Sequence, residues 1–347
     1  MKFGIRLPVT GPFSQKGFIV ETARLGEELG YDSLWTQGHI LWTRAQHTGQ
    51  LSVGSFEAIT PDQDPNKYDS ITVLSYLAGI TERIRLGFSV FVIPMSHPVV
   101  TAKVVADLDI LSDGRVIFCT SPGGPLIKPD FELLGIDHSK RAEMADEFIP
   151  AVRDLWSHDD CSLDGKYVKY RNISIYPKPV QKPHPPIWIA GGNPTAVSRA
   201  ARFGSGWMLS TIDPRGLLPE ISDYSQSIET CRRQAADRFG RKPEEVGEYA
   251  LEIFGCIMPT DEEARAIASK TIDARRNLHA NHFGKNLPSV EQVLKINLVG
   301  SPGTIVQKVE EFRRAGATTL ELRFIARTFE EMKTMMREFS AGVMSSF

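Results

Sequence analysis

The side chains able to do chemistry in this sequence are mostly small or carry a hydroxyl group, and they follow short apolar runs. Ser89 and Val90 lie within the run IRLGFSVFV, Thr120 follows RVIFC, and Ser210 and Thr211 follow GWML or lie next to it. Hydroxyl groups and backbone amides at such places can hold a ligand, but they supply no strong acid or base. This composition is typical of a site that binds a large planar cofactor.

The segment AGGNPTAV is the most informative of these local patterns. It joins a short apolar run to a helical pattern, and it contains Gly191, Gly192, Asn193 and Thr195. The two glycines would let backbone N–H groups approach a phosphate at the N-terminus of the helix, where such groups are free and the helix dipole is positive. An ordinary strand-to-helix turn with an Asn-Pro start is the alternative.

One histidine and two aromatic residues stand at comparable places. His39 follows the run SLWT, and its ordinary pKa near neutrality suits a general base or a proton donor beside a ring. The alternative is a packing or surface histidine. Trp42 and Phe91 could line a substrate pocket by stacking on an aromatic ligand, or could simply cover the core.

Several kinds of site are disfavoured because their motifs are missing. The sequence has no HEXXH, no GxSxG and no GxxxxGK[ST], and its carboxylates and histidines form no cluster with metal-ligand spacing. We therefore expect no metal, and we disfavour a hydrolase or a kinase.

The elements that must position these residues alternate regularly along the chain. Short β-rich runs are predicted at 2–7, 33–36, 84–92, 115–119, 187–190, 206–209, 249–258 and 319–324. Amphipathic helical patterns lie between and after them, at 18–29, 69–80, 98–111, 140–156, 195–203, 302–315 and 328–344. A further helical region follows the run at 206–209 and ends at about residue 239. Strict alternation favours an α/β fold, a closed (β/α)8 TIM barrel, over an open doubly wound sheet. In such a barrel the residues named above would meet at the C-terminal mouth.

We expect residues 1–347 to form one domain with three insertions, near 43–68, 158–186 and 261–294. The second reads as a β-hairpin with a proline-rich return, and the third as an irregular helical stretch. The first lies beside His39, and we expect it to choose the substrate. The first and third are natural lids for the mouth.

Composition limits the partners and the compartment. The formal net charge is −2, and no run of Lys or Arg exceeds two residues, so nucleic acid and anionic membranes are not expected partners. The four cysteines form no CxxC pair, which indicates a reducing compartment. No apolar stretch is long enough for a signal peptide or a membrane span, and we expect a cytoplasmic protein.

Three longer stretches resemble the bacterial luciferase-like monooxygenase superfamily. They are GIRLP…ARLGEELGYDSLW, ITERIRLGFSVFVIPMSHPVVTAKVVADLDILSDGR and YPKPVQKPHPPIWIAGGNPTAVSRAARFGSGWML. The similarity covers residues 1–210 and, more loosely, the last fifty. It implies a (β/α)8 barrel that binds reduced FMN or the deazaflavin coenzyme F420.

The resemblance also implies roles for individual residues. His39 stands where the family keeps a histidine beside the reactive face of the ring, and Ser89–Val90 stands where members hold a non-prolyl cis peptide behind the ring. The segment near the cofactor phosphate corresponds to Gly191, Gly192, Asn193 and Thr195, and the next strand end to Ser210 and Thr211.

Two departures from the family pattern leave the choice of cofactor open. FMN users of the luciferase type tend to have an arginine near position 122, where this chain has Pro122. F420-linked sugar dehydrogenases have a glutamate near position 124, where this chain has Gly124.

The expected function is a flavin-dependent monooxygenase that uses reduced flavin and O2 on a small organic substrate, with a separate flavin reductase and a homodimer as possible partners. One alternative is hydride transfer with coenzyme F420, in which His39 gives or takes the proton. A second alternative is a non-catalytic flavin-binding partner subunit.

Overall fold

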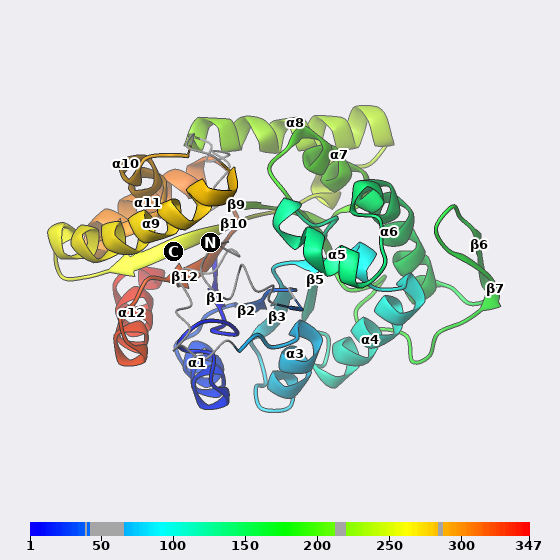
Figure 1. The fold of residues 1–347 in the computed structure, drawn as a ribbon, viewed down its shortest axis with the longest axis horizontal. Helices are drawn as coiled ribbons and strands as arrows, with labels where there is room; N and C mark the ends of the chain where they lie inside the picture. Colours follow the sequence, from blue (N-terminus) through cyan, green and yellow to red (C-terminus); the bar gives the residue numbers. More distant parts are fainter. Residues whose placement is uncertain (39, 42–65, 212–219, 284–286) are drawn as a thin grey trace.

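The apolar runs of the sequence form parallel strands that pair around a closed ring. The computed structural model describes residues 1–38, 40–41, 66–211, 220–283 and 287–347. Each strand pairs with the next along the ring, and the pairings of β12 with β1 and of β9 with β10 complete the closure. The result is the predicted (β/α)8 barrel (Figure 1). Its strands are β1 (Lys2–Arg6), β2 (Ser33–Thr36), β3 (Arg85–Phe88), β5 (Val116–Ser121), β8 (Ile187–Ala190), β9 (Gly206–Ser210), β10 (Glu248–Ile257) and β12 (Thr319–Phe324).

The strand predicted at 84–92 is interrupted. It forms β3 and a two-residue strand, β4 (Phe91–Val92), with the peptide between Ser89 and Val90 in the cis form. β4 pairs with the end of β5. A further short strand, β11 (Leu298–Gly300), was not expected from the sequence and pairs with the last residues of β10.

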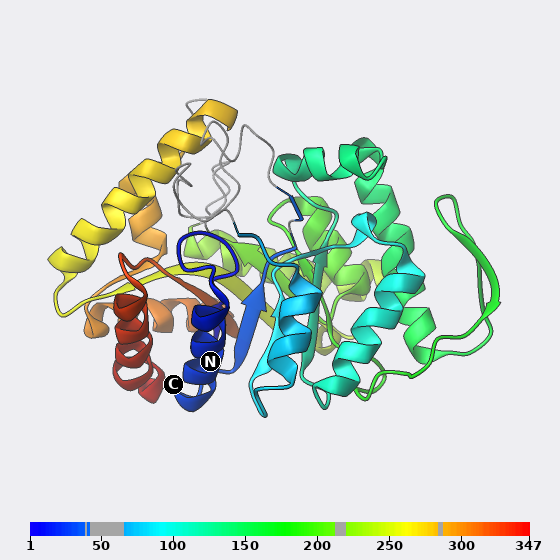
Figure 2. The ribbon, with the colours of Figure 1, turned by 60° about the horizontal axis from the view of Figure 1, so that its bottom comes forward.

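Helices surround the strands, as Figure 2 shows from a second side. Several begin with a side-chain cap, among them α7, where Asn193 accepts from the backbone N–H of Ala196, and α12, where Thr328 accepts from that of Glu331. The helices are α1 (Lys16–Glu28), α3 (Ser70–Ala78), α4 (Pro98–Leu111), α5 (Lys128–Leu133), α6 (Arg141–Ser157), α7 (Pro194–Phe203), α8 (Ile221–Phe239), α9 (Asp261–Phe283), α10 (Val290–Ile296), α11 (Pro302–Arg314) and α12 (Phe329–Gly342). Short 3-10 turns lie at Ile93–Met95, Pro125–Ile127, His138–Lys140, Pro243–Glu245 and Met344–Ser346.

Two of the predicted insertions are described. The predicted hairpin forms β6 (Cys161–Asp164) and β7 (Lys169–Ile173), which pair antiparallel and project from the right-hand edge of the molecule in Figure 1. The segment 261–294 was predicted to be helical but irregular. It is helical, with the long helix α9 followed by the first residues of α10. Most of the first insertion lies outside the described residues. No helix in the described ranges is long and apolar enough to cross a membrane.

Two tryptophans fill the barrel interior. The rings of Trp35 and Trp188 lie 5.4 Å apart, in a buried cluster with Ile117, Cys119, Met208 and Ala250. Glycines on neighbouring strands make room for them: a Cβ on Gly87 would lie 2.3 Å from Trp35 Cε3, and one on Gly206 would lie 2.6 Å from Trp188 Cδ1. The interior is therefore closed by packed rings, and a ligand site must lie beyond them, toward the C-terminal strand ends.

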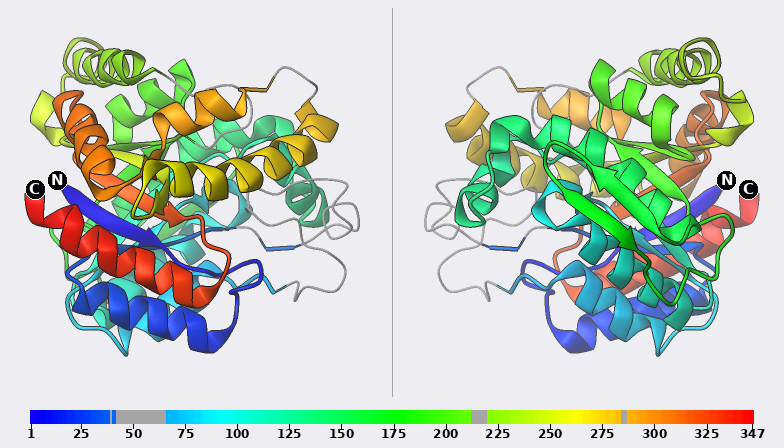
Figure 3. Two further views of the ribbon diagram at one scale, coloured as in Figure 1. Left: turned by 90° about the vertical axis from the view of Figure 1, so that its left-hand side faces the viewer. Right: turned by 90° about the vertical axis from the view of Figure 1, so that its right-hand side faces the viewer.

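The two ends of the chain lie side by side (Figure 3). The ring of Phe3 on β1 lies 5.3 Å from that of Phe339 on α12 and 6.1 Å from that of Phe347. The last helix, α12, thus packs on the first strand, β1. This contact stabilises the place where the first and last strands of the barrel pair.

Candidate functional site

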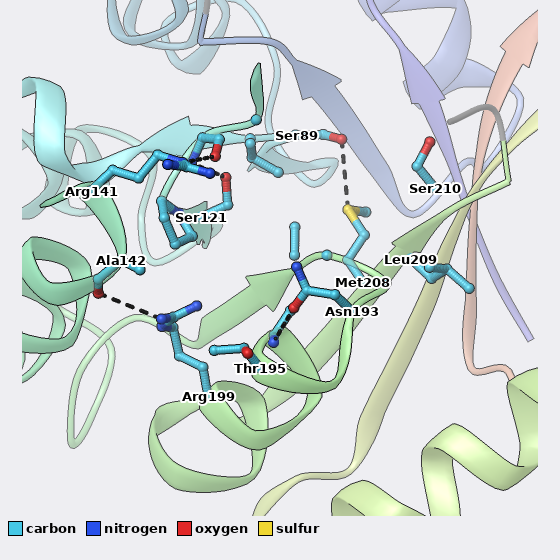
Figure 4. Close-up of a pocket in the computed structure, with 18 of the residues that line it drawn as sticks. Ser89, Ser121, Arg141, Ala142, Asn193, Thr195, Arg199, Met208, Leu209 and Ser210 are labelled. Carbon is cyan, nitrogen blue, oxygen red and sulfur yellow. Dashed lines mark hydrogen bonds between the residues drawn. The ribbon is translucent and has the colours of Figure 1, made fainter. Parts of the chain in front are cut away.

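A cavity of about 390 Å³ opens at the C-terminal ends of the strands, and Figure 4 shows side chains that line it. Its wall comes from the segments that follow β3, β5, β8 and β9, together with the first turns of α6 and α7. The lining residues are Ser89, Val90, Ser121, Pro122, Gly123, Gly124, Pro125, Arg141, Ala142, Ala190, Gly191, Gly192, Asn193, Thr195, Ala196, Arg199, Met208, Leu209, Ser210 and Glu252.

Two arginines stand on one side of this cavity, away from Ser89, Met208 and Ser210 (Figure 4). Arg141 donates to the carbonyl oxygens of Gly123 at 3.1 Å and His138 at 2.9 Å. Arg199 is held by Asp146, with Nε 2.6 Å from Oδ1, and its side chain is only 4% exposed. Because both guanidinium groups are fixed by these bonds, they present positive charge in a defined place.

The N-terminus of α7 faces the cavity beside these arginines. Gly191 has a φ of 136°, which side chains rarely adopt, and a Cβ on Gly192 would lie 2.7 Å from Leu209 Cδ1. The side chain of Asn193 caps the helix by accepting from Ala196 N at 2.8 Å. A helix N-terminus next to two arginines favours an anion, and a phosphate group fits this end of the cavity.

The opposite side of the cavity is formed around the cis peptide between Ser89 and Val90. The Ser89 carbonyl oxygen accepts from Arg6 Nη1 at 2.7 Å, and Ser89 Oγ lies 3.6 Å from Met208 Sδ. Gly38 packs behind the peptide, where a Cβ would lie 2.4 Å from the Val90 oxygen. This peptide, with Ala190 and Met208, gives a small, mostly apolar surface on which a flat ring system can rest.

Charged side chains from three strands lie together inside the barrel, and one of them, Glu252, lines the cavity. Arg6 on β1 contacts Glu252 on β10, and its Nε lies 2.8 Å from Glu321 Oε1 on β12. Arg323 Nη1 lies 3.7 Å from Glu252 Oε1. Glu252 lines the cavity, whereas Glu321 is fully buried.

The pKa values of the two carboxyl groups, Glu252 and Glu321, are shifted in opposite directions. Burial raises the pKa of Glu321 to about 7, helped by the charge of Glu252 and opposed by Arg6. Burial also acts to raise the pKa of Glu252, but Arg6 and Arg323 outweigh it, and the pKa of Glu252 is lowered. Burial raises the pKa of the nearby Cys119 thiol well above its ordinary value.

The structure brings most of the expected cofactor-binding residues together. Those that line the cavity are Ser89, Val90, Gly191, Gly192, Asn193, Thr195 and Ser210. His39 and Trp42 lie outside the described residues.

Three expected site residues do not line the cavity. Thr120 is fully buried and donates its hydroxyl to the Phe91 carbonyl at 2.8 Å. Phe91 packs in the core against Phe118, with ring centroids 5.3 Å apart. Thr211 donates its hydroxyl at 3.0 Å to the carbonyl of Glu252, so its hydroxyl serves the fold.

Sequence reasoning missed Arg141, Arg199 and Glu252. Arg199 had a signal, because it follows Thr195 by one helical turn and therefore shares its face. Glu252 had another, since it is a carboxylate within the otherwise apolar strand YALEIFGCI. No signal in the sequence pointed to Arg141, because an arginine at the start of a helix is common. No group of three or more His, Cys, Asp or Glu side chains in the described ranges could hold a metal ion.

Comparisons with known proteins agree with this architecture. The model of the luciferase-like monooxygenase family matches residues 1–319. The FMNH2-dependent dimethylsulfone monooxygenase of Pseudomonas putida is 23% identical over 285 residues, which cover 75% of this chain and 74% of that protein.

Two solved structures share the fold over the whole chain. A monooxygenase from Streptomyces bottropensis is 25% identical, with a TM-score of 0.77 over 100% of this chain and 99% of that one. An F420-dependent secondary alcohol dehydrogenase is 16% identical, with a TM-score of 0.76 over the same shares of the two chains.

Proposed function

Because this chain belongs to the luciferase-like monooxygenase family, we propose that it is a flavin-dependent monooxygenase that uses reduced FMN and O2 to oxidise a small organic substrate. Enzymes among its relatives depend on FMNH2 or on coenzyme F420. The choice of FMN rests on two sequence relatives that are FMNH2-dependent dimethylsulfone monooxygenases.

The observation that carries the proposal is the difference in charge between the two sides of the cavity. Its cationic side, with Arg141, Arg199 and the N-terminus of α7, suits a phosphate, and its far side, with the Ser89–Val90 peptide and Met208, suits a flat ring. FMN has this same division into a phosphate and a tricyclic ring. The absence of an arginine at Pro122 is no obstacle, because Arg141 and Arg199 supply positive charge to the same cavity.

The protein's own residues would bind and orient the cofactor and keep water from it. Reduced FMN supplies the electrons with which O2 is activated. Asn193 and Thr195 would hold the phosphate, Ser89 and Val90 would support the ring from behind, and Gly191 and Gly192 would allow its close approach. We retain His39 as the proton donor or acceptor and Trp42 as a wall of the substrate pocket.

Two further parts of the proposal concern partners. An enzyme that consumes reduced flavin needs a source of it, and we propose a separate flavin reductase. We also propose that the chain works as a homodimer, which size-exclusion chromatography with light scattering would establish.

Anaerobic titration with reduced FMN and reduced F420, side by side, tests the proposal. We expect tight binding of reduced FMN, and, on adding O2 with candidate substrates, oxygen uptake coupled to product. His39→Ala should bind the flavin and lose the coupling. Exclusive binding of F420 would replace the proposal with hydride transfer, and binding of FMN without turnover on any substrate would favour a non-catalytic flavin-binding subunit.

A further inference from the structure

Two glutamates lie next to each other inside the barrel, and one of them, Glu252, lines the cavity. Glu252 on β10 and Glu321 on β12 are partners in the register of the parallel pair, so their side chains leave neighbouring strands toward the same interior. Like charges placed side by side repel, most of all where water is scarce. Both residues are largely shielded from solvent, Glu252 at 9% exposed and Glu321 at 0%.

Arg6 contacts both glutamates, but of the two it donates a hydrogen bond only to Glu252. Arg323 also approaches Glu252. Arg6 Nε lies 2.8 Å from Glu321 Oε1 without the alignment of a hydrogen bond, and the Ser89 hydroxyl is the other donor that acts on this carboxyl group among the described residues. An ionised carboxylate in that position would have fewer well-aligned donors than a buried carboxylate needs, whereas a neutral carboxylic acid needs fewer.

We propose that Glu252 and Glu321 form an acid–base pair that holds one proton at neutral pH, and that Glu252 and the Ser89 hydroxyl present this pair to the ligand in the cavity. Glu321 carries the proton and Glu252 is the ionised partner. The ligand suited to it is a heterocycle with ring nitrogen and carbonyl groups, which can exchange hydrogen bonds with either form. In its application to flavin the inference rests on the proposed function.

Polar and charged groups from several elements face Glu321, and they act on its proton in opposite directions. Arg6 faces it from β1, Ser89 from the turn after β3, Cys119 from β5, Glu252 from β10 and Arg323 from its own strand, β12. Burial and Glu252 raise the pKa of Glu321 to about 7, against the opposing effects of Arg6, Ser89 and Arg323. Ser210 and Arg6 hold Glu252 in its charged form.

The link to the cavity runs through atoms that already have fixed places. Arg6, which contacts both glutamates, donates to the carbonyl and hydroxyl oxygens of Ser89 at 2.7 and 3.2 Å. Figure 4 shows Ser89 beside Met208 at the cavity. A change of charge at the pair therefore acts next to the surface on which the ring would rest.

Infrared spectroscopy of the protein without cofactor tests the proton directly. In 13C-glutamate-labelled wild type we expect a carboxylic-acid C=O band at pH 6 that fades as the pH passes about 7. The band should be absent from Glu321→Gln and unchanged in Glu248→Gln, a matched control at the other end of β10. A wild-type spectrum without such a band at pH 6, or a band that survives in Glu321→Gln, would overturn the proposal.

A second variant covers the case in which Glu321→Gln does not fold. Glu252→Gln removes the neighbouring negative charge, so the band of Glu321 should fade at a lower pH than in the wild type. An unchanged midpoint would show that the two groups do not share a proton equilibrium, which contradicts the pair.

Cofactor binding then tests the connection to the ligand. For wild type we expect the dissociation constant of the reduced cofactor to change at least threefold between pH 6 and pH 8 beyond the change seen with Glu321→Gln. Equal pH profiles would contradict the link between the pair and the cavity. Failure of wild type to bind FMN or F420 at any pH would overturn the proposed function instead, and the infrared result would still decide whether the proton is there.

Discussion

At the scale of single residues, charge is distributed unevenly around the cavity. Arg141 and Arg199 stand beside the N-terminus of α7, whereas Glu252 is the one other charged residue among the described residues that line the cavity. Hydrogen bonds to ionised groups contribute more than neutral ones, about 1.5–3 kcal/mol each. The arginines should therefore account for much of the affinity for a phosphorylated cofactor and for little of the affinity for its ring.

Arg141→Gln tests this division. We expect FMN to bind about tenfold or more weakly, because a charged donor to the phosphate is lost, while riboflavin, which has no phosphate, binds as before. Lys140→Gln is the matched control, since Lys140 is the neighbouring cation but its nearest charged partner is Glu143 on the exposed surface. Equal losses for FMN and riboflavin would place the phosphate elsewhere.

The buried carboxyl of Glu321 makes the stability of the protein depend on pH. Its pKa is raised to about 7 in the folded state, above the ordinary value of 4.5, so the folded state binds more protons between these values. The stabilising contribution is thus complete below about pH 4.5 and is lost as the pH rises through about 7. In denaturant unfolding, Glu321→Gln should be less sensitive to pH than wild type over this range, and an identical slope would contradict the assignment.

The residue types near the site could be predicted from the sequence. Whether each side chain faces the barrel interior or the helices could not always be predicted. Side chains alternate between the two faces of a strand, so a shift of one position decides whether a residue faces the barrel interior or the helices. Cys119 faces inward and Thr120 therefore outward, toward Phe91. Gly191, Gly192 and Asn193 could be predicted because a strand-to-helix turn has few possible conformations. Arg141 could not, since its role depends on where α6 begins in space.

At the scale of elements, the start of α7 combines a structural and a binding role. Asn193 caps the helix and also lines the cavity, whereas Thr328 caps α12, away from the lining residues. Caps of this kind are worth about 1 kcal/mol.

The two caps can be compared by substitution. Asn193→Ala and Thr328→Ala should each lower the free energy of unfolding by about 1 kcal/mol, because each removes one helix cap. Only Asn193→Ala should also weaken FMN binding, since it alone loosens the helix end that would face the phosphate. Equal FMN affinity in both variants and wild type, measured by isothermal titration, would count against a phosphate at α7.

Elements with clear end signals could be predicted closely. α4 and β12 have the predicted bounds. Pro98 starts the helix and SDG follows it, and the alternation of apolar and charged residues in TLELRF defines the strand. The break in the strand at 84–92 could not be predicted from its composition, which is apolar almost throughout. α5 and β11 escaped prediction because six and three residues give too little periodicity.

At the scale of the whole molecule, the closed barrel depends on the fit of Trp35 and Trp188 beneath the cavity. The alternation of strands and helices was enough to predict closure, because sequential parallel strands with covering helices have few other arrangements. The packing inside could not be predicted, since it depends on which glycines from distant strands meet the two rings.

Gly87→Ala should disturb this packing. The added Cβ would lie 2.3 Å from Trp35 Cε3, so the ring must move, and we expect a loss of about 1–3 kcal/mol in the free energy of unfolding. Gly303→Ala is the control: it lies within α11 with nothing within 4 Å of the added atom, and it should stabilise the protein slightly. A neutral Gly87→Ala in denaturant unfolding would show that the interior tolerates more volume than the structure indicates.

The most direct test of the central claim is a crystal structure of the protein with FMN bound. We expect the phosphate at the N-terminus of α7, within hydrogen-bond distance of Arg141 or Arg199, and the ring against the Ser89–Val90 peptide above Glu252. FMN bound at another place, or bound in this cavity with its phosphate away from both arginines, would contradict the assignment of this cavity as the cofactor site.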